Sequence, residues 1–366
     1  MFFLIRRLID NEQIAFVSGL LWMLNPFLIT MIVFGHGSQM MTAAYFPITL
    51  YFLLRLKDEQ SISNMLLFAL FLGFQLQRAH VQIAYYACML LGSFFAYAFF
   101  QNKNRKFASF FCVGLIIAFL IAAHIYIPSL DYRAMSIRSG DMGSFAYATN
   151  WSMHPKELLT YIMPNYFGFG GSSYSGFMPF TDFPNYVGLF VLLFAFLSLK
   201  NLNKETIFFW SVLIISIFLS LGKYFEIFYQ FFYNYLPFFN SFRVPSMILI
   251  LSNFCLYILC AYGVKDVIEI FKNKFKDFKP ELIIFTFLIV SLIDIYRIDN
   301  RIINPDDDSG QQNQITSINN FESVFEQDET ISYLKDNLGL NRIYPAGSLF
   351  TDPKFKYHGI ESVGGY

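Results

Sequence analysis

Side chains that could do chemistry gather in a few polar segments of this 366-residue chain. They include four of its five histidines, arginines able to hold a phosphate through paired hydrogen bonds, and carboxylates able to act as a general base. The set comprises His36, Gln39, Arg78, His80, Gln82, His124, Asp131, Arg133, Arg138, Asp141, His154, Lys156, Glu157, Asp182 and Arg243. Such a set indicates a polar site, although its histidines do not have the spacing of a metal motif.

No motif of a soluble enzyme accompanies these residues. The glycines between 168 and 171 lack the strand and helix that flank a nucleotide-binding loop, and no GxSxG, HExxH or Walker pattern occurs. The chain has no CxxC pair, so it has no zinc-site signature. Its 26 basic residues balance 26 acidic ones, which disfavours a nucleic-acid partner.

The elements that must position the polar residues are apolar. Only 14% of the chain is charged, against about 25% in a soluble domain. Nine windows together contain 156 residues and only one of the 52 charges, Asp294. They are 14–33, 40–54, 62–77, 82–100, 107–130, 186–199, 207–221, 246–264 and 282–295. Buried helices of a large soluble protein are the weaker explanation, so the pattern predicts an all-α polytopic membrane protein with about nine transmembrane helices.

The basic residues predict the orientation. If the N-terminus is cytoplasmic, the inner segments carry 14 Lys and Arg residues and the outward loops carry six. Loops 131–182 and 222–245 then face outward, on the side that holds the polar set. We therefore expect a transmembrane domain over 1–298 and the start of an extracytoplasmic domain over 299–366. That tail should be α/β, with a helix near 330–338 and a strand at 341–344.

The aromatic residues are densest at 224–242, where 11 of 19 residues are Tyr or Phe. Aromatic rings favour the headgroup level of a bilayer. The segment is therefore interpreted as an interfacial helix, or alternatively as one wall of a groove for a lipid substrate.

Several of these segments carry a family resemblance. The motifs that carry it are FGHGSQ at 34–39, YFP at 45–47, QRAHVQIAYY at 77–86, YATNWSMHPKEL at 147–158, PNYFGFGG at 164–171, YSG at 174–176, PNYVG at 184–188, SLGKY at 220–224, LPFFNSFRVPS at 236–246 and GIESVGGY at 359–366. In their order and spacing they resemble the bacterial YfhO-type membrane proteins, and the resemblance runs along the whole chain.

The resemblance implies a glycosyltransferase of the multi-spanning GT-C fold in the bacterial cytoplasmic membrane. Such enzymes transfer a sugar from a polyprenyl-phosphate donor to a cell-envelope glycan, such as a teichoic acid, on the outer face. Their general base is typically an Asp or Glu in the first outward loop, but the corresponding segment here, 34–39, has no carboxylate. The family usually has a further span before this point and continues beyond residue 366, so the chain is expected to be a fragment lacking both ends.

The candidate residues are assigned from charge and predicted face. Arg78, His80, Arg138 and Arg243 are expected at the donor phosphate, and His36, Trp151, His154 and Glu157 at the sugar or acceptor. The catalytic base is unknown, with Glu157 and Asp141 as weak candidates. No metal site is predicted, although a divalent cation is a possible cofactor. The expected partners are the lipid-linked donor, the envelope acceptor and membrane lipids.

The alternative is a membrane protein without enzymatic activity, such as a transporter, a flippase or an envelope-assembly scaffold. A proton-coupled transporter would carry charges or broken helices near the middle of its spans. Only Asp294 interrupts the nine windows, and it lies close to an end. The sequence therefore favours the enzyme.

Overall fold

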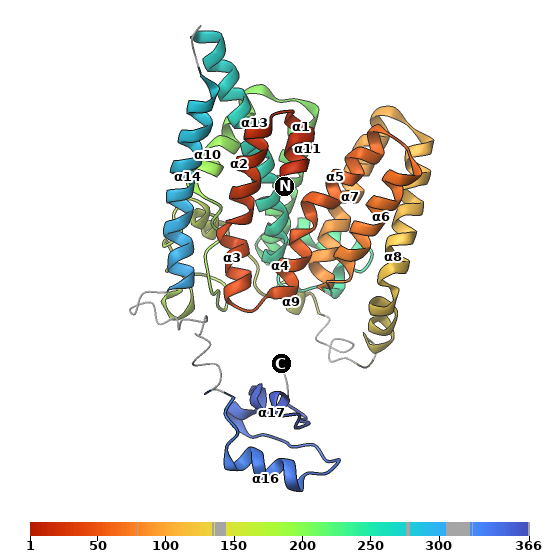
Figure 1. Ribbon diagram of the computed structural model, residues 1–366, viewed down its shortest axis with the longest axis vertical. Helices are drawn as coiled ribbons and strands as arrows, with labels where there is room; N and C mark the ends of the chain where they lie inside the picture. The colour runs from red at the N-terminus through yellow and green to blue at the C-terminus, as the bar shows by residue number, and fades with distance from the viewer. Residues whose placement is uncertain are drawn as a thin grey trace. The chain divides into compact units, whose positions relative to one another are not determined.

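The computed structural model describes residues 1–78, 80–133, 135, 144–275, 279–304, 323 and 325–364. It divides into two compact units, Met1–Gln312 and Asn313–Tyr366, each described here by itself (Figure 1). Every regular element of the described residues is a helix. The prediction of an all-α fold is therefore confirmed for this part of the chain.

The α-helices of the first unit are α1 (Phe2–Ile9), α2 (Glu12–Met23), α3 (Pro26–Val33), α4 (Gly37–Ala44), α5 (Phe46–Asp58), α6 (Ile62–Leu76), α7 (Val81–Asn102), α8 (Arg105–Arg133), α9 (Phe145–Ala148), α10 (Leu189–Leu197), α11 (Lys204–Ser220), α12 (Glu226–Tyr235), α13 (Leu249–Lys274) and α14 (Pro280–Ile303). Its 3-10 helices are η3 (Pro155–Tyr161), η4 (Gly171–Ser173), η5 (Ser198–Asn201), η6 (Gly222–Phe225), η7 (Phe239–Ser241) and η8 (Pro245–Ile248). All nine uncharged windows contain helix.

Fewer helices than windows meet the length of a membrane span. Four described helical stretches are long and apolar enough to cross a bilayer: Glu12–Val33, Val81–Asn102, Arg105–Tyr132 and Pro245–Lys274. A fifth is the pair Lys204–Ser220 and Gly222–Tyr235, if a bend of 109° is allowed within one span. Among the described residues the number nine is not reached because the chain breaks between α4 and α5, because α6 and α10 are short, and because α14 carries charges in its C-terminal half.

The bend after α11 leaves α12 with one exposed apolar side. Ile227, Phe231 and Tyr235 recur every four residues and are 85%, 59% and 75% exposed. Tyr229 points the other way, is 2% exposed and packs against Phe239. The aromatic segment thus contains a helix, α12, and this helix is amphipathic.

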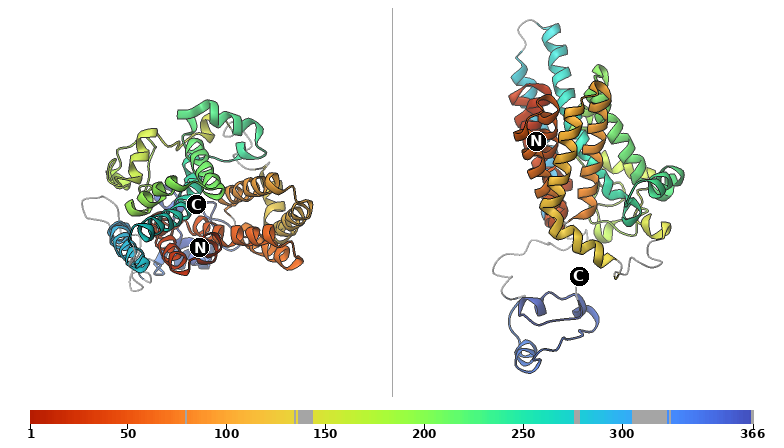
Figure 2. Two further views of the ribbon diagram at one scale, coloured as in Figure 1. Left: turned by 90° about the horizontal axis from the view of Figure 1, so that it is seen from above. Right: turned by 90° about the vertical axis from the view of Figure 1, so that its right-hand side faces the viewer.

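Helix α13 is the centre of the first unit. It packs against α1, α2, α7, α10, α11 and α14, and 94% of its most apolar window is buried, compared with 22% for α8. Viewed along the helices, α5 to α8 lie on one side of α13, with α10 and α14 on another (Figure 2). Glycine makes the closest of these contacts possible. A Cβ atom on Gly263 would lie 1.7 Å from the carbonyl oxygen of Phe194 in α10.

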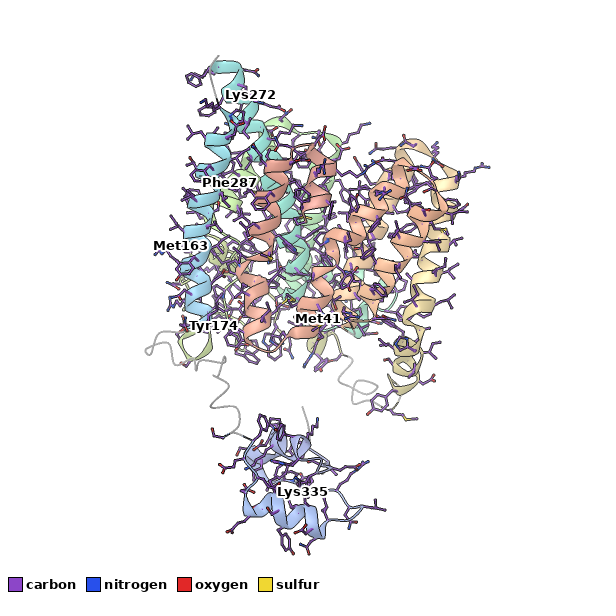
Figure 3. The ribbon with its side chains drawn as sticks, in the orientation of Figure 1. Met41, Met163, Tyr174, Lys272, Phe287 and Lys335 are labelled. Atoms are coloured by element: carbon purple, nitrogen blue, oxygen red, sulfur yellow. The ribbon has the colours of Figure 1, made fainter. Side chains whose placement is uncertain are left out.

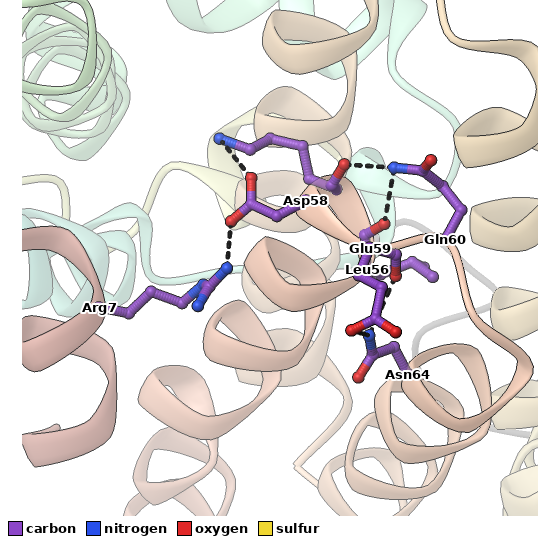
Figure 4. A network of polar contacts seen from close by, with 7 residues as sticks. Arg7, Leu56, Asp58, Glu59, Gln60 and Asn64 are labelled. Atoms are coloured by element: carbon purple, nitrogen blue, oxygen red, sulfur yellow. Dashed lines mark hydrogen bonds and ion pairs between the residues drawn. The ribbon is translucent and has the colours of Figure 1, made fainter.

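A polar network joins α1 to α5 at the end of the bundle that carries Arg6, Arg7 and Lys57 (Figure 4). The Arg7 guanidinium donates to the Asp58 carboxylate, which also pairs with Lys57. Both partners of the Arg7–Asp58 pair are more than one-third exposed, so its contribution to stability is about 0.2–1 kcal/mol.

The second unit is small and contains α16 (Glu329–Asn337), η10 (Gly347–Thr351) and α17 (Lys354–Tyr357) around a core of Ile331, Phe355 and Ile360. Helix α16 confirms the helix predicted near 330–338. The strand predicted at 341–344 is not formed in the described residues, where Ile343 makes only an isolated bridge to Ser362. One bridge pairs too few backbone groups to make a sheet, so the predicted α/β tail is not confirmed.

Candidate functional site

The turn before α4, the turn before α7 and the segment 175–187 meet at one end of the first unit. Met41 of α4 and Tyr174 mark this end in Figure 3, and it lies opposite Lys272. Aromatic packing holds the segments together, because the Phe183 ring contacts Phe27 at 5.7 Å and stacks on Phe34 at 6.3 Å between ring centroids. Residues adjacent to this packing are thereby fixed in space.

His36, His80 and Asp182 form the centre of the candidate site. His36 is near enough for its charge to influence the titration of both His80 and Asp182, so these three side chains, from segments distant in sequence, lie in one region of the protein. Burial raises the pKa of Asp182 above its usual value, and His36 opposes that rise. Asp182 is half-buried and its titration is shifted, which is typical of a functional carboxylate.

His80 also has a structural duty. Its Nδ1 atom accepts a hydrogen bond from the backbone N–H of Ile83 at 3.2 Å and caps the start of α7. The proton of the neutral ring is therefore assigned to Nε2. Burial lowers the pKa of His80 below its usual value, and His36 lowers it further. At neutral pH His80 would offer a ligand one hydrogen bond rather than a positive charge.

Arg243 is exposed and held beside the N-terminal turns of α7. Its Nη1 donates to the Tyr147 hydroxyl at 3.2 Å, and its guanidinium lies over the Tyr147 ring at 5.5 Å. Gln82 donates to the Arg243 carbonyl at 2.6 Å, and the Tyr85 hydroxyl donates to the Pro237 carbonyl at 2.7 Å. These two bonds tie the segment 237–243 to the helix that begins after His80.

Two further predicted residues lie at the edges of this region. Arg78 turns back and donates through Nε to the Phe74 carbonyl at 3.3 Å. Trp151 has a φ of 58°, and its indole N–H donates to the Phe180 carbonyl at 3.1 Å, two residues before Asp182. Arg78 and Trp151 thus flank the centre while also serving the loops that form it.

Glu157 does not have the environment expected of a catalytic base or a sugar ligand. It is 1% exposed, and its carboxylate accepts hydrogen bonds from His154 N at 3.0 Å, Phe177 N at 3.1 Å and the Tyr174 hydroxyl. Burial raises the pKa of Tyr174, and its bond to Glu157 raises it further, so Tyr174 remains the donor. These bonds give Glu157 a structural role, and its assignment to the chemistry stays a prediction.

His154 belongs to the same structural network. Its Nδ1 accepts from Lys156 N at 3.1 Å and caps η3, which begins at Pro155. Its ring stacks on Phe177 at 3.8 Å and meets Tyr224 edge-on at 4.7 Å. The contacts of the His154 ring with Phe177 and Tyr224 account for a histidine at this position without a contact to the acceptor substrate.

Glu157→Gln should lower the stability of the protein by about 1–3 kcal/mol, because its new amide group would face a backbone donor in a buried site. The measurement is thermal unfolding in detergent. Glu269→Gln is the matched control, since Glu269 is half-exposed and only pairs with Lys265 on its own helix. Equal melting temperatures for Glu157→Gln and wild type would contradict the structural role.

Arg138 and Asp141 lie outside the described residues. Within the described ranges, no three His, Cys, Asp or Glu side chains are grouped to hold a metal ion. The possible divalent cation therefore stays a prediction.

Asp182 belongs to the polar set predicted from the sequence, but the sequence predicts no specific role for it. The only local signal was its position in a polar loop, whereas its importance comes from His36, which precedes it by 146 residues. No protein-family model, curated protein or solved structure matches this chain.

Proposed function

We propose that this protein is a membrane glycosyltransferase of the GT-C type, which transfers a sugar from a polyprenyl-phosphate donor to a cell-envelope glycan or teichoic-acid-type acceptor. The observation that carries the proposal is a half-buried Asp182 in the same region as His36 and His80, at one end of an apolar helical bundle. An exposed Arg243 is tied to this region through Gln82, two residues after His80. A carboxylate and hydrogen-bond donors beside an arginine suit the transfer of a sugar from a phosphate.

Asp182 is the general base in this proposal. It removes the proton of the acceptor hydroxyl as that oxygen attacks the anomeric carbon of the sugar. Arg243 stabilises the charge that develops on the departing lipid phosphate, because a guanidinium binds phosphate oxygens in a paired geometry. His80 donates through Nε2 to the phosphate, and His36 orients the Asp182 carboxylate.

The proposal also includes the membrane arrangement. The chain has about nine membrane-crossing segments in the bacterial cytoplasmic membrane, some short or broken, with the N-terminus in the cytoplasm. The site then faces outward, where a flipped lipid-linked sugar is available and soluble nucleotide sugars are not. Aromatic α12 lies beside the site and suits contact with the lipid of the donor.

The test is sugar transfer by the full chain in lipid nanodiscs, with a panel of radiolabelled polyprenyl-phosphate hexoses and envelope fractions as acceptor. Arg243→Ala should lower kcat/KM for the donor about 10- to 100-fold, because a hydrogen-bonded charge contributes about 1.5–3 kcal/mol. Arg7→Ala is the control, because Arg7 lies at the other end of the bundle. Wild-type transfer by Arg243→Ala would overturn the assignment, and no label transferred by the wild type would overturn the function.

A further inference from the structure

Helix α14 buries a carboxylate that the proposed chemistry does not use. Asp299 is 8% exposed, and its Oδ1 atom has no hydrogen-bond partner in the described part of the chain. None of the ion pairs found among the described residues includes Asp299. Asp299 lies outside the nine apolar windows, because the last window ends at 295 whereas helix α14 continues to Ile303.

Asp294 on the same helix provides the contrast. Its carboxylate accepts from the Tyr186 hydroxyl at 2.6 Å and from Leu189 N at 2.7 Å, and so caps α10. Two donors of this kind stabilise the ionised form of Asp294. Asp299, five residues further along, has no comparable donor within the described chain.

Among the described residues, the helices that pack on Asp299's helix do not supply a compensating charge. Helix α14 packs on α2, α3, α10 and α13. Neither α3 nor α10 contains an acidic, basic, Tyr or Cys residue, and the only such residue of α2 is Glu12, in its first turn. Tyr257 of α13 is close enough to interact with Asp299, but its hydroxyl donates to the Val187 carbonyl at 2.8 Å.

The basic residues of α14 itself are engaged elsewhere. Arg297 acts on Tyr186. Arg301 donates to Asn165 Oδ1 at 2.7 Å and lies 4.4 Å above the Phe169 ring. Both therefore serve the loop side of the helix rather than Asp299.

Other buried polar atoms without protein partners occur on the same packed helices. They are Asn25 Nδ2 at the break between α2 and α3, Asn253 Nδ2 on α13 and Ser291 Oγ on α14. The two amides are oriented, because Asn25 Oδ1 accepts from Phe27 N and Asn253 Oδ1 accepts from the Tyr161 hydroxyl. A helix break and buried hydrogen-bonding groups are features through which water and protons reach the interior of membrane proteins.

An ionised carboxylate without a partner is very costly in a medium of low dielectric constant, whereas a neutral carboxylic acid is not. We propose that Asp299 is a proton-binding site inside the helical bundle, distinct from the residues of the proposed transfer chemistry. It holds its proton at rest, and when water reaches it the O–H bond breaks, the proton passes to water and the electron pair stays on the carboxylate.

Infrared difference spectroscopy of the full chain in nanodiscs tests this inference without any transfer assay. At neutral pH the wild type should show the carbonyl stretch of a neutral carboxylic acid, and Asp299→Asn should lose it. Asp294→Asn is the matched control and should keep it. An identical carbonyl region in wild type and Asp299→Asn would overturn the proposal.

Labelling with dicyclohexylcarbodiimide, which reacts with neutral carboxyl groups in apolar surroundings, gives a second test. Peptide mapping should find the label on Asp299 and not on Asp294, and labelling should fall as the pH rises. Absence of label on Asp299 in the folded protein would contradict the inference. Protection by Na⁺ at constant pH would overturn it in favour of a metal-cation site.

Discussion

Asp182→Asn should lower sugar transfer by about 10²- to 10⁴-fold, the range that a general base contributes. Asparagine has the same shape as aspartate but cannot take the proton of the acceptor hydroxyl, so donor binding and folding should be preserved. The measurement is single-turnover transfer with saturating donor. Asp131→Asn is the matched control, because Asp131 is an exposed residue near the end of α8. Transfer at the wild-type rate by Asp182→Asn would remove Asp182 from the chemistry.

The pH dependence of sugar transfer tests the same role of Asp182 as a general base. A base must be ionised, so activity is lost as the pH falls through the pKa of Asp182. Burial raises that pKa, and the opposing charge of His36 does not fully restore it. The acid limb should therefore lie above the usual 3.8 of an aspartate, and His36→Gln should move it to higher pH. An unchanged acid limb in His36→Gln would show that the two side chains are not coupled in catalysis.

Gly263→Ala should be the most damaging single-methyl substitution in the bundle. The added carbon would lie 1.7 Å from the Phe194 carbonyl oxygen, which belongs to the backbone of α10 and cannot rotate away. Separation of α10 from α13 would follow, at a cost of about 1–3 kcal/mol or more. The expected result is a lower melting temperature and loss of the monodisperse peak in size-exclusion chromatography.

Gly92 provides the control for this substitution. It also lies inside an apolar helix, α7, but a Cβ atom there has nothing within 4 Å. Gly92→Ala should therefore leave the melting temperature unchanged or raise it slightly, because alanine favours helix by about 1 kcal/mol over glycine. Equal behaviour of Gly92→Ala and Gly263→Ala would mean that α10 and α13 do not pack as closely as described.

The helical class of the fold was predictable because it depends on local composition. A window that has no charge and is as long as a helix shows by its composition alone that it can form an apolar helix. Each of the nine windows contains helix in the structure. Span number was less predictable, because it depends on where helices break. Tyr45 interrupts the window 40–54 without adding a charge, whereas the break at Asn25 and Pro26 leaves Glu12–Val33 long enough to cross a bilayer.

The candidate site was predictable only in part. Proximity to the ends of helices placed His36, His80 and Arg243 on one side of the protein. Their neighbours could not be inferred, because the influence of His36 on Asp182 depends on how the segment 175–187 folds back over α3. The surroundings of Glu157 could not be inferred for the same reason, since its partners Tyr174 and Phe177 follow it by 17 and 20 residues.

The bend of 109° between α11 and α12 has a consequence for the bilayer around the protein. Because Ile227, Phe231 and Tyr235 are exposed along one side of α12, this helix would lie in the plane of one leaflet and fix the depth of the protein there. A thicker membrane could not then be matched by sinking the bundle, so the surrounding acyl chains would have to compress. The lipids next to the protein would then be thinned to the same extent. Their phosphates would lie at nearly the same depth as Arg243 in membranes of different thickness.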